Sequence, residues 1–137
     1  QIGDKINQGS NLGNLGVAYQ SLGQYEEAIV QHEKALQISK EIGDKRAEGA
    51  SLGNLGVVYQ NIGQYEDAIE QFKMALNISK EIGDKRTQGI QLGNLGLVYQ
   101  NFGQFENAIL HFKQTINISR EIGDKRAVGI FLGNLIS

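Results

Sequence analysis

The chain is organised by a segment that returns every 40 residues. The segment LGNLGVVYQNIGQYEDAI at 52–69 has close copies at 12–29 and 92–109, and its first four residues return at 132–135. A fixed period of this length is the signature of a stacked array, in which each unit buries its apolar face against its neighbours. The period therefore constrains the fold more strongly than any single residue does.

The period divides the 137 residues into three full units and part of a fourth. We expect a single array, because no linker or low-complexity segment separates the units, and three units are enough for such a stack to be stable. The chain begins by repeating the junction at Glu41 to Lys45 and stops inside a unit, so we interpret it as a piece of a longer array. The units span about 3–42, 43–82, 83–122 and 123–137.

Each unit is predicted to form two helices. In the second unit Gly43 and Gly63 mark helix ends, and Asp44 is an N-cap. Apolar residues of this unit recur at steps of three and four, the period of a helix, as at Leu52, Leu55, Val58, Tyr59 and Ile62. Because the loops are very short, consecutive helices must pack antiparallel, which predicts an all-α stack of helix-turn-helix units. The predicted helices span about 5–22, 25–42, 45–62, 65–82, 85–102 and 105–122, with a partial helix from 125.

Composition excludes several classes of function. The net charge of −2 and the pI near 5.7 provide no basic field to hold a phosphate backbone, so no nucleic acid partner is expected. No apolar run is long enough to span a membrane, so no membrane partner is expected either. The chain has no cysteine, which excludes disulfides and thiolate metal sites. No signal peptide is visible, and we expect a cytoplasmic protein without a cofactor.

Glycine is unusually frequent for a helical chain, in which each internal glycine costs about 1 kcal/mol relative to alanine. All 18 glycines fall at five positions of the unit, represented by Gly43, Gly49, Gly53, Gly56 and Gly63. Two of these positions are helix ends. We expect Gly56 to contact the second helix of its own unit. For Gly49 and Gly53 two interpretations are open, either close packing against another backbone or an inner surface left free for a ligand.

A set of apolar and small residues recurs at fixed positions of each unit. In the second unit the set comprises Leu52, Leu55, Gly56, Tyr59, Gly63, Tyr65, Ala68, Phe72 and Ala75. This pattern resembles the tetratricopeptide repeat, and the resemblance covers the whole chain. It departs from that family in its period of 40 rather than 34, in the absence of proline, and at His32 and Thr115.

The resemblance implies a right-handed superhelical solenoid, in which the first helices of the units line a concave groove for a peptide or a partner protein. The long unit is most similar to those of kinesin light chains, of the G-protein regulators that orient spindles, and of cyanobacterial arrays.

The resemblance also places the candidate groove residues on the first helix of each unit. Two rows of amides recur there, and an amide offers both a donor and an acceptor to the backbone of an extended peptide. Apolar side chains between the rows would accept apolar anchors. The predicted groove residues are Asn14, Val17 and Gln20 in the first unit, Asn54, Val57, Gln60 and Asn61 in the second, and Asn94, Leu97, Gln100 and Asn101 in the third.

The amides have a second interpretation, in which Asn54 and its equivalents bond neighbouring helices and hold the stack in register. A clamp for a peptide carboxylate is not expected, because Gly53 and Val57 stand where that clamp needs lysine and asparagine.

The remaining polar residues predict no chemistry. His32 takes the place of an aromatic residue of the other units, which favours a core residue over a metal ligand, and His111 is expected to be solvated. The turn 44–46 is either an anion site at a helix start or simply a capped turn. Ser39 and its equivalents have no nearby base to activate them. We therefore predict no enzyme and no metal site.

The alternative to a ligand-binding scaffold is a structural array, natural or engineered, that associates end to end. The partial fourth unit has no second helix to cover its apolar residues, which are Phe131, Leu132, Leu135 and Ile136. The first helix likewise lacks a preceding partner, and exposed apolar ends favour homo-oligomers. An RNA-reading helical repeat is a more distant alternative, since such repeats need basic grooves.

Overall fold

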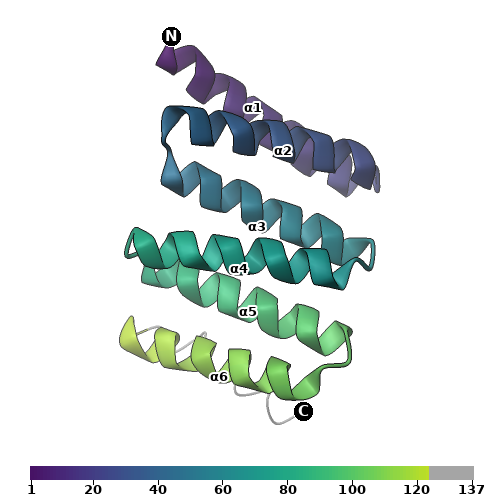
Figure 1. The fold of residues 1–137 in the computed structure, drawn as a ribbon, viewed down its shortest axis with the longest axis vertical. Coiled ribbons are helices and arrows are strands. Elements are labelled where there is room, and N and C mark those ends of the chain that lie inside the picture. The colour runs from purple at the N-terminus through teal and green to yellow at the C-terminus, as the bar shows by residue number, and fades with distance from the viewer. Residues whose placement is uncertain (124–137) are drawn as a thin grey trace.

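A computed structural model describes residues 1–123, which form six helices and no strand. The helices stack in chain order from the N-terminus to α6 (Figure 1). Their bounds are α1 Ile2–Ser21, α2 Tyr25–Ile42, α3 Lys45–Asn61, α4 Tyr65–Glu81, α5 Lys85–Asn101 and α6 Phe105–Glu121.

The predicted helices are confirmed to within one residue at every end except the first. Helix α1 begins at Ile2 rather than near residue 5, where the 40-residue period places the equivalent of Lys45, the first residue of α3. In the structure Asp4 lies in the first turn of α1, and no side chain caps this helix.

Short loops with a left-handed glycine make consecutive helices antiparallel. At the end of α3, Gly63 has a φ of 79°, a value that glycine adopts without strain. The Gln64 amide donates to the Tyr59 carbonyl at 2.9 Å, and the Gly63 amide donates to the Gln60 carbonyl at 3.0 Å, which is the Schellman arrangement. At the other junction, Asp44 accepts from the Ala47 amide at 3.0 Å and starts α3.

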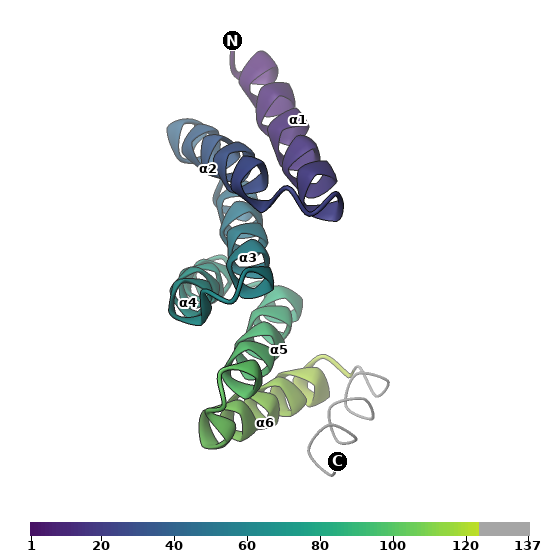
Figure 2. The same ribbon diagram turned by 90° about the vertical axis from the view of Figure 1, so that its right-hand side faces the viewer.

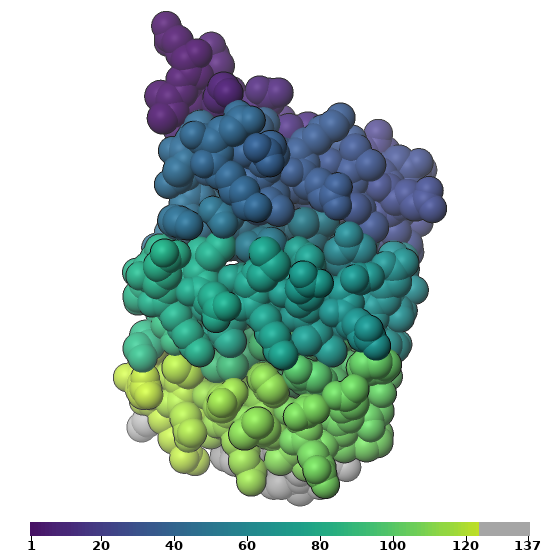
Figure 3. Space-filling model, in the orientation of Figure 1, coloured from purple at the N-terminus to yellow at the C-terminus, as the bar shows by residue number. Residues whose placement is uncertain are grey.

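The helices pack in pairs, α1 with α2, α3 with α4, and α5 with α6, and the pairs join through the contacts of α2 with α3 and of α4 with α5. Seen from the side, α1, α3 and α5 follow one another along the stack, with α2 and α4 beside them (Figure 2). On the face that carries α2 and α4, the chain forms successive bands from α1 to α6 (Figure 3). This arrangement is an all-α solenoid.

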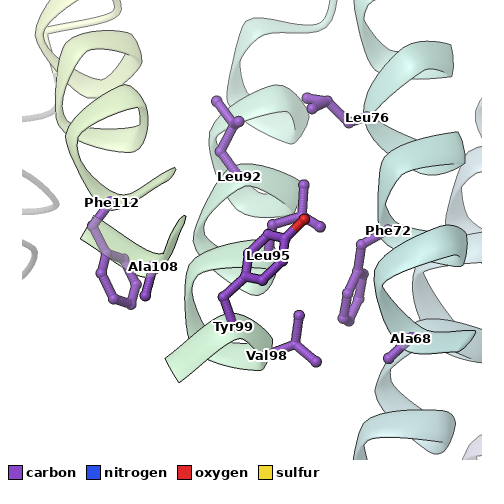
Figure 4. Packing of buried hydrophobic residues seen from close by; sticks show 9 residues of the cluster. All are labelled: Ala68, Phe72, Leu76, Leu92, Leu95, Val98, Tyr99, Ala108 and Phe112. Atoms are coloured by element: carbon purple, nitrogen blue, oxygen red, sulfur yellow. The ribbon is translucent and has the colours of Figure 1, made fainter. Parts of the chain in front are cut away.

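The largest buried cluster lies where α4 meets α5 and α6 (Figure 4). Phe72 from α4 and Leu95 from α5 are both 0% exposed. The cluster comprises Ala68, Phe72, Leu76, Leu92, Leu95, Val98, Tyr99, Ala108 and Phe112. Side chains of one unit's second helix therefore pack against the first helix of the next unit, which joins the units into one core.

A glycine of α3 makes room for the Phe72 ring. A Cβ atom added at Gly56 would lie 2.6 Å from Cε1 of Phe72, which is shorter than any normal contact. A Cβ atom added at Gly96 would lie equally close to the ring of Phe112, and one added at Gly16 equally close to the ring of His32. The prediction that Gly56 contacts the second helix of its own unit is confirmed.

The interpretation that Gly49 and Gly53 leave an inner surface open is wrong. A Cβ atom at Gly49 would lie 3.3 Å from Cγ2 of Ile78, and one at Gly53 would lie 3.1 Å from Nε2 of Gln91. Both glycines are buried because neighbouring helices cover them. Gly13 differs, since nothing lies within 4 Å of a Cβ atom placed there.

These contacts predict opposite effects of alanine at two glycines of the same helical type. Gly56→Ala should destabilise the fold by about 1–3 kcal/mol, because the buried Phe72 ring cannot move away. Gly13→Ala should stabilise it by up to about 1 kcal/mol through helix propensity alone. Urea denaturation followed by circular dichroism measures both; equal effects of the two substitutions would contradict this account of the glycines.

Candidate functional site

The predicted groove residues all lie on α1, α3 and α5, the first helices of the three units. Val17 is 47% exposed and Leu97 is 43% exposed, so both present apolar surface to solvent. Val57 differs from them, because it is half-buried and packs against the cluster of Figure 4. Of the amides, Asn14, Asn61, Gln100 and Asn101 are exposed, and Gln20, Asn54, Gln60 and Asn94 are partly exposed.

The amide rows do not hold neighbouring helices together within residues 1–123. Asn94 donates from Nδ2 to Oε1 of Gln91 at 3.4 Å, a long bond inside its own helix. The side chains of Asn14 and Asn54 make no hydrogen bond in this part of the chain. The side chains of these two residues therefore keep their donors and acceptors available to a ligand or to water.

A pocket of about 220 Å³ lies between α1 and α3, with α2 behind it. Small residues form much of its wall, including Gly9, Gly13, Ala47 and Ser51, and Asn54 stands at its margin. This pocket was missed by the sequence analysis, which assigned the groove from family positions and so left Ser51 out.

The sequence profile of the tetratricopeptide repeat matches residues 8–81, and a second profile of the same repeat matches residues 91–126. The chain belongs to the tetratricopeptide repeat family. Repeats of this family generally serve as scaffolds for protein interaction. No curated protein sequence matches the chain significantly.

Solved structures show the same tetratricopeptide fold. The chain is similar to the TPR domain of Arabidopsis FLU, with a TM-score of 0.78 and 23% identity over 82% of this chain and 95% of that one. It is also similar to aspartyl phosphate phosphatase F from Bacillus subtilis, with a TM-score of 0.86 and 23% identity over 93% of this chain and 33% of that one. It is similar as well to BtubC from P. vanneervenii, with a TM-score of 0.79 and 18% identity over 98% of this chain and 63% of that one. The tetratricopeptide chain thus spans a third of the second structure and less than two thirds of the third.

The turn at 44–46 of this tetratricopeptide chain is a capped turn whose cations are paired. Lys45 lies 3.8 Å from both Glu48 and Glu81. The guanidinium of Arg46 donates to Oδ2 of Asp84 in the next unit at 2.7 Å. With carboxylates beside both cations, the turn offers no vacant anion site.

The Asp84 carboxylate joins two adjacent repeats. It accepts from the side chain and the backbone amide of Thr87 and from Arg46, and these bonds hold the pKa of the Asp84 carboxyl below its usual range. A lowered folded-state pKa stabilises the fold above the ordinary aspartate range, and the contribution is lost as the pH falls through the folded-state pKa.

The histidines and acidic side chains of residues 1–123 form no metal-ligating cluster. The hydroxyls of Ser39 and Ser79 donate to the carbonyls of Leu36 and Leu76 at 2.7 Å, which occupies the proton that a base would remove. Within this stretch no three His, Asp or Glu side chains gather as a metal would require. None of the six helices combines the length and apolarity needed to cross a membrane.

The two histidines occupy different environments. His111 is half-buried rather than fully solvated as expected, because its ring packs 5.0 Å from that of Tyr99 and its Nδ1 lies 2.7 Å from the Asn107 carbonyl oxygen. His32 is 0% exposed, and neither ring nitrogen has a hydrogen-bond partner. Burial lowers the pKa of the His32 imidazole. The prediction that His32 is a core residue is confirmed.

His32 is therefore predicted to make the fold sensitive to mildly acidic pH. Because its folded-state pKa is lowered, the unfolded chain binds the proton more readily, and stability should fall by up to about 1.4 kcal/mol per pH unit below about 6.5. His32→Phe copies Phe72 and should raise stability at neutral pH by about 1–3 kcal/mol, because it removes an unsatisfied polar ring.

The measurement is urea denaturation at pH 7.5, 6.5 and 5.5. His32→Phe should abolish the loss of stability between these values. His111→Gln, which restores the residue found at positions 31 and 71, is the matched control and should keep the loss. A parent chain whose stability is constant over this range would contradict the assignment.

Proposed function

We propose that this tetratricopeptide array is a cytoplasmic scaffold that holds an extended peptide, or a segment of a partner protein, along the face formed by α1, α3 and α5. The observation that carries the proposal is the pair of amides at Asn14 and Asn54, whose side chains have no hydrogen-bond partner within residues 1–123. Exposed apolar side chains also lie on these first helices, with Val17 on α1 and Leu97 on α5. Such a face offers backbone hydrogen bonds together with places for apolar anchors.

We also propose that the chain belongs to the long-unit subclass similar to kinesin light chains. The support is the 40-residue period, six residues longer than the usual repeat of this family. The extra length lies in the helices, because the described helices have 17 to 20 residues and the loops remain short.

A random peptide display library tests the scaffold. The parent chain should select a common motif, and the double variant Asn54→Glu/Asn94→Glu should bind the selected peptides about 30-fold more weakly. That factor corresponds to the loss of two hydrogen bonds of about 1 kcal/mol each. Affinity is measured by fluorescence polarisation with a labelled selected peptide.

The matched control makes the same change on the second helices, at Asn77→Glu/Asn117→Glu. Both of these asparagines are exposed on α4 and α6, so the net charge of the control equals that of the test variant. The control should keep parental affinity. Parental affinity in the Asn54/Asn94 variant would show that the ligand binds elsewhere.

A second candidate function is end-to-end self-association of the array. Leu15 on α1 is 42% exposed, whereas its equivalents Leu55 and Leu95 are 2% and 0% exposed. The outer face of α1 therefore presents apolar surface that a neighbouring helix covers in the other two units. The residues predicted for the opposite end, which are Phe131, Leu132, Leu135 and Ile136, lie outside the described residues.

Light scattering after size exclusion tests this second candidate. The mass of the parent chain should rise with protein concentration, and Leu15→Lys should reduce the association at least about ten-fold. A monomeric mass for the parent at every concentration would exclude this function while leaving the peptide scaffold in place.

A further inference from the structure

The pocket between α1 and α3 is twice as large as its counterpart between α3 and α5. The first has a volume of about 220 Å³ and the second about 110 Å³. The two pockets share several lining positions of the repeat, such as Gly9 with Gly49 and Ile38 with Ile78. Only the first pocket continues along the helices to Gly13.

A glutamine side chain accounts for the difference. In the second interface Gln91 is 6% exposed, and its Nε2 lies 3.1 Å from the place of a Cβ atom at Gly53. Its Oε1 is the acceptor for Asn94 at 3.4 Å. The Gln91 carboxamide thus lies on a glycine of α3 and is held by an asparagine of its own helix.

The first interface has the same surroundings without the carboxamide. Position 51 is serine where position 91 is glutamine, and Gly13 has nothing within 4 Å of a Cβ atom. The equivalent of Asn94 is Asn54, which lines the pocket and whose side chain makes no hydrogen bond within residues 1–123.

The Ser51 hydroxyl is the second side-chain group of this pocket without a protein partner. Ser51 is only 7% exposed, and its hydroxyl makes no hydrogen bond in the described part of the chain. The hydroxyl oxygen is not fully enclosed, because among the described residues only the ring nitrogens of His32 are fully buried without a partner, so a ligand atom can reach it from the pocket. Together Ser51 and Asn54 offer donors and acceptors in a space whose wall also includes Gly9, Gly13 and Ile38, with the charged residues Lys5 and Asp44.

We propose that this pocket binds a primary carboxamide, the side chain of a glutamine in a peptide that lies along α1 and α3. This assignment rests on the proposed scaffold function and deepens it by naming an anchor residue of the ligand. The glutamine amide takes the position over Gly13 that Gln91 takes over Gly53, with its carbonyl accepting from Asn54. The Ser51 hydroxyl bonds the same amide.

The surroundings select against close analogues of glutamine. A leucine side chain has a similar size but leaves Ser51 and Asn54 without partners, which costs about 1–3 kcal/mol. A glutamate brings a negative charge near the Asp44 carboxylate, which lines the pocket. The Lys5 ammonium, which also lines it, is already paired with Glu41 at 2.8 Å.

Nuclear magnetic resonance of the isotope-labelled full chain tests the assignment, with N-acetyl-glutamine methylamide as the probe. The probe should produce saturable amide shifts at Gly13, Ser51 and Asn54, with millimolar affinity. The matching glutamate and leucine methylamides should bind at least about ten-fold more weakly, the factor that one unsatisfied polar group gives.

Two variants exchange the residues of the two interfaces. Ser51→Gln should fill the pocket with the protein's own carboxamide and abolish the probe shifts, and an unchanged or raised melting temperature shows that it is folded. Gln91→Ser should open the second pocket and add a new set of shifts at Gly53 and Asn94.

The pocket assignment is overturned if the parent gives no saturable shifts, if the three probes bind equally, or if Ser51→Gln keeps the probe shifts. These failures differ from failure of the scaffold function. If the chain selects display peptides that lack glutamine and does not bind the probe, only the pocket assignment is contradicted. If the chain binds the probe through Ser51 but selects no peptide, only the scaffold function is contradicted.

Discussion

The stack depends on a large side chain of one helix resting directly on a glycine of its partner. The Phe72 ring occupies the space above Gly56 and reaches the first helix of the next unit, so one ring connects three helices. Aromatic burial of this kind contributes a large share of core stability in a small domain. The glycine lowers helix propensity by about 1 kcal/mol relative to alanine, and it permits the close approach of α3 and α4 that the Phe72 ring requires. In the first unit the His32 ring lies over Gly16 in the same way, and both of its ring nitrogens are left without a hydrogen-bond partner.

Most of the fold was predictable from the sequence, because the signals are local and occur three times. Gly43 and Asp44 end one helix and begin the next by their own backbone preferences, and the helical period of the apolar residues does not depend on the neighbours. The prediction was less good where a contact crosses between units. The sequence leaves Gly53 open to a ligand because its own unit places nothing over it, and the covering residue, Gln91, comes from the following repeat.

The candidate site was predictable only in part for the same reason. The family resemblance placed Asn54 and its equivalents on the first helices, and the structure shows that they do not brace the stack within residues 1–123. The pocket beside Asn54 depends on Ser51, which differs from Gln91 in a comparison of units but carries no known role in the repeat pattern. The effect of this difference on the pocket can be predicted only once it is known that a side chain at this position lies across a helix of the preceding unit.

Each unit carries both of its own junctions, the left-handed glycine that reverses the chain after the first helix and the aspartate that begins the next unit. A duplicated or deleted unit therefore creates no new kind of interface, because every added surface meets the surface it already meets elsewhere in the stack. The number of units can change by recombination within the gene while the helices stay folded. Length is thus the property of this architecture that evolution can adjust most freely, one whole unit at a time. A change in length also changes the distance that the molecule can span.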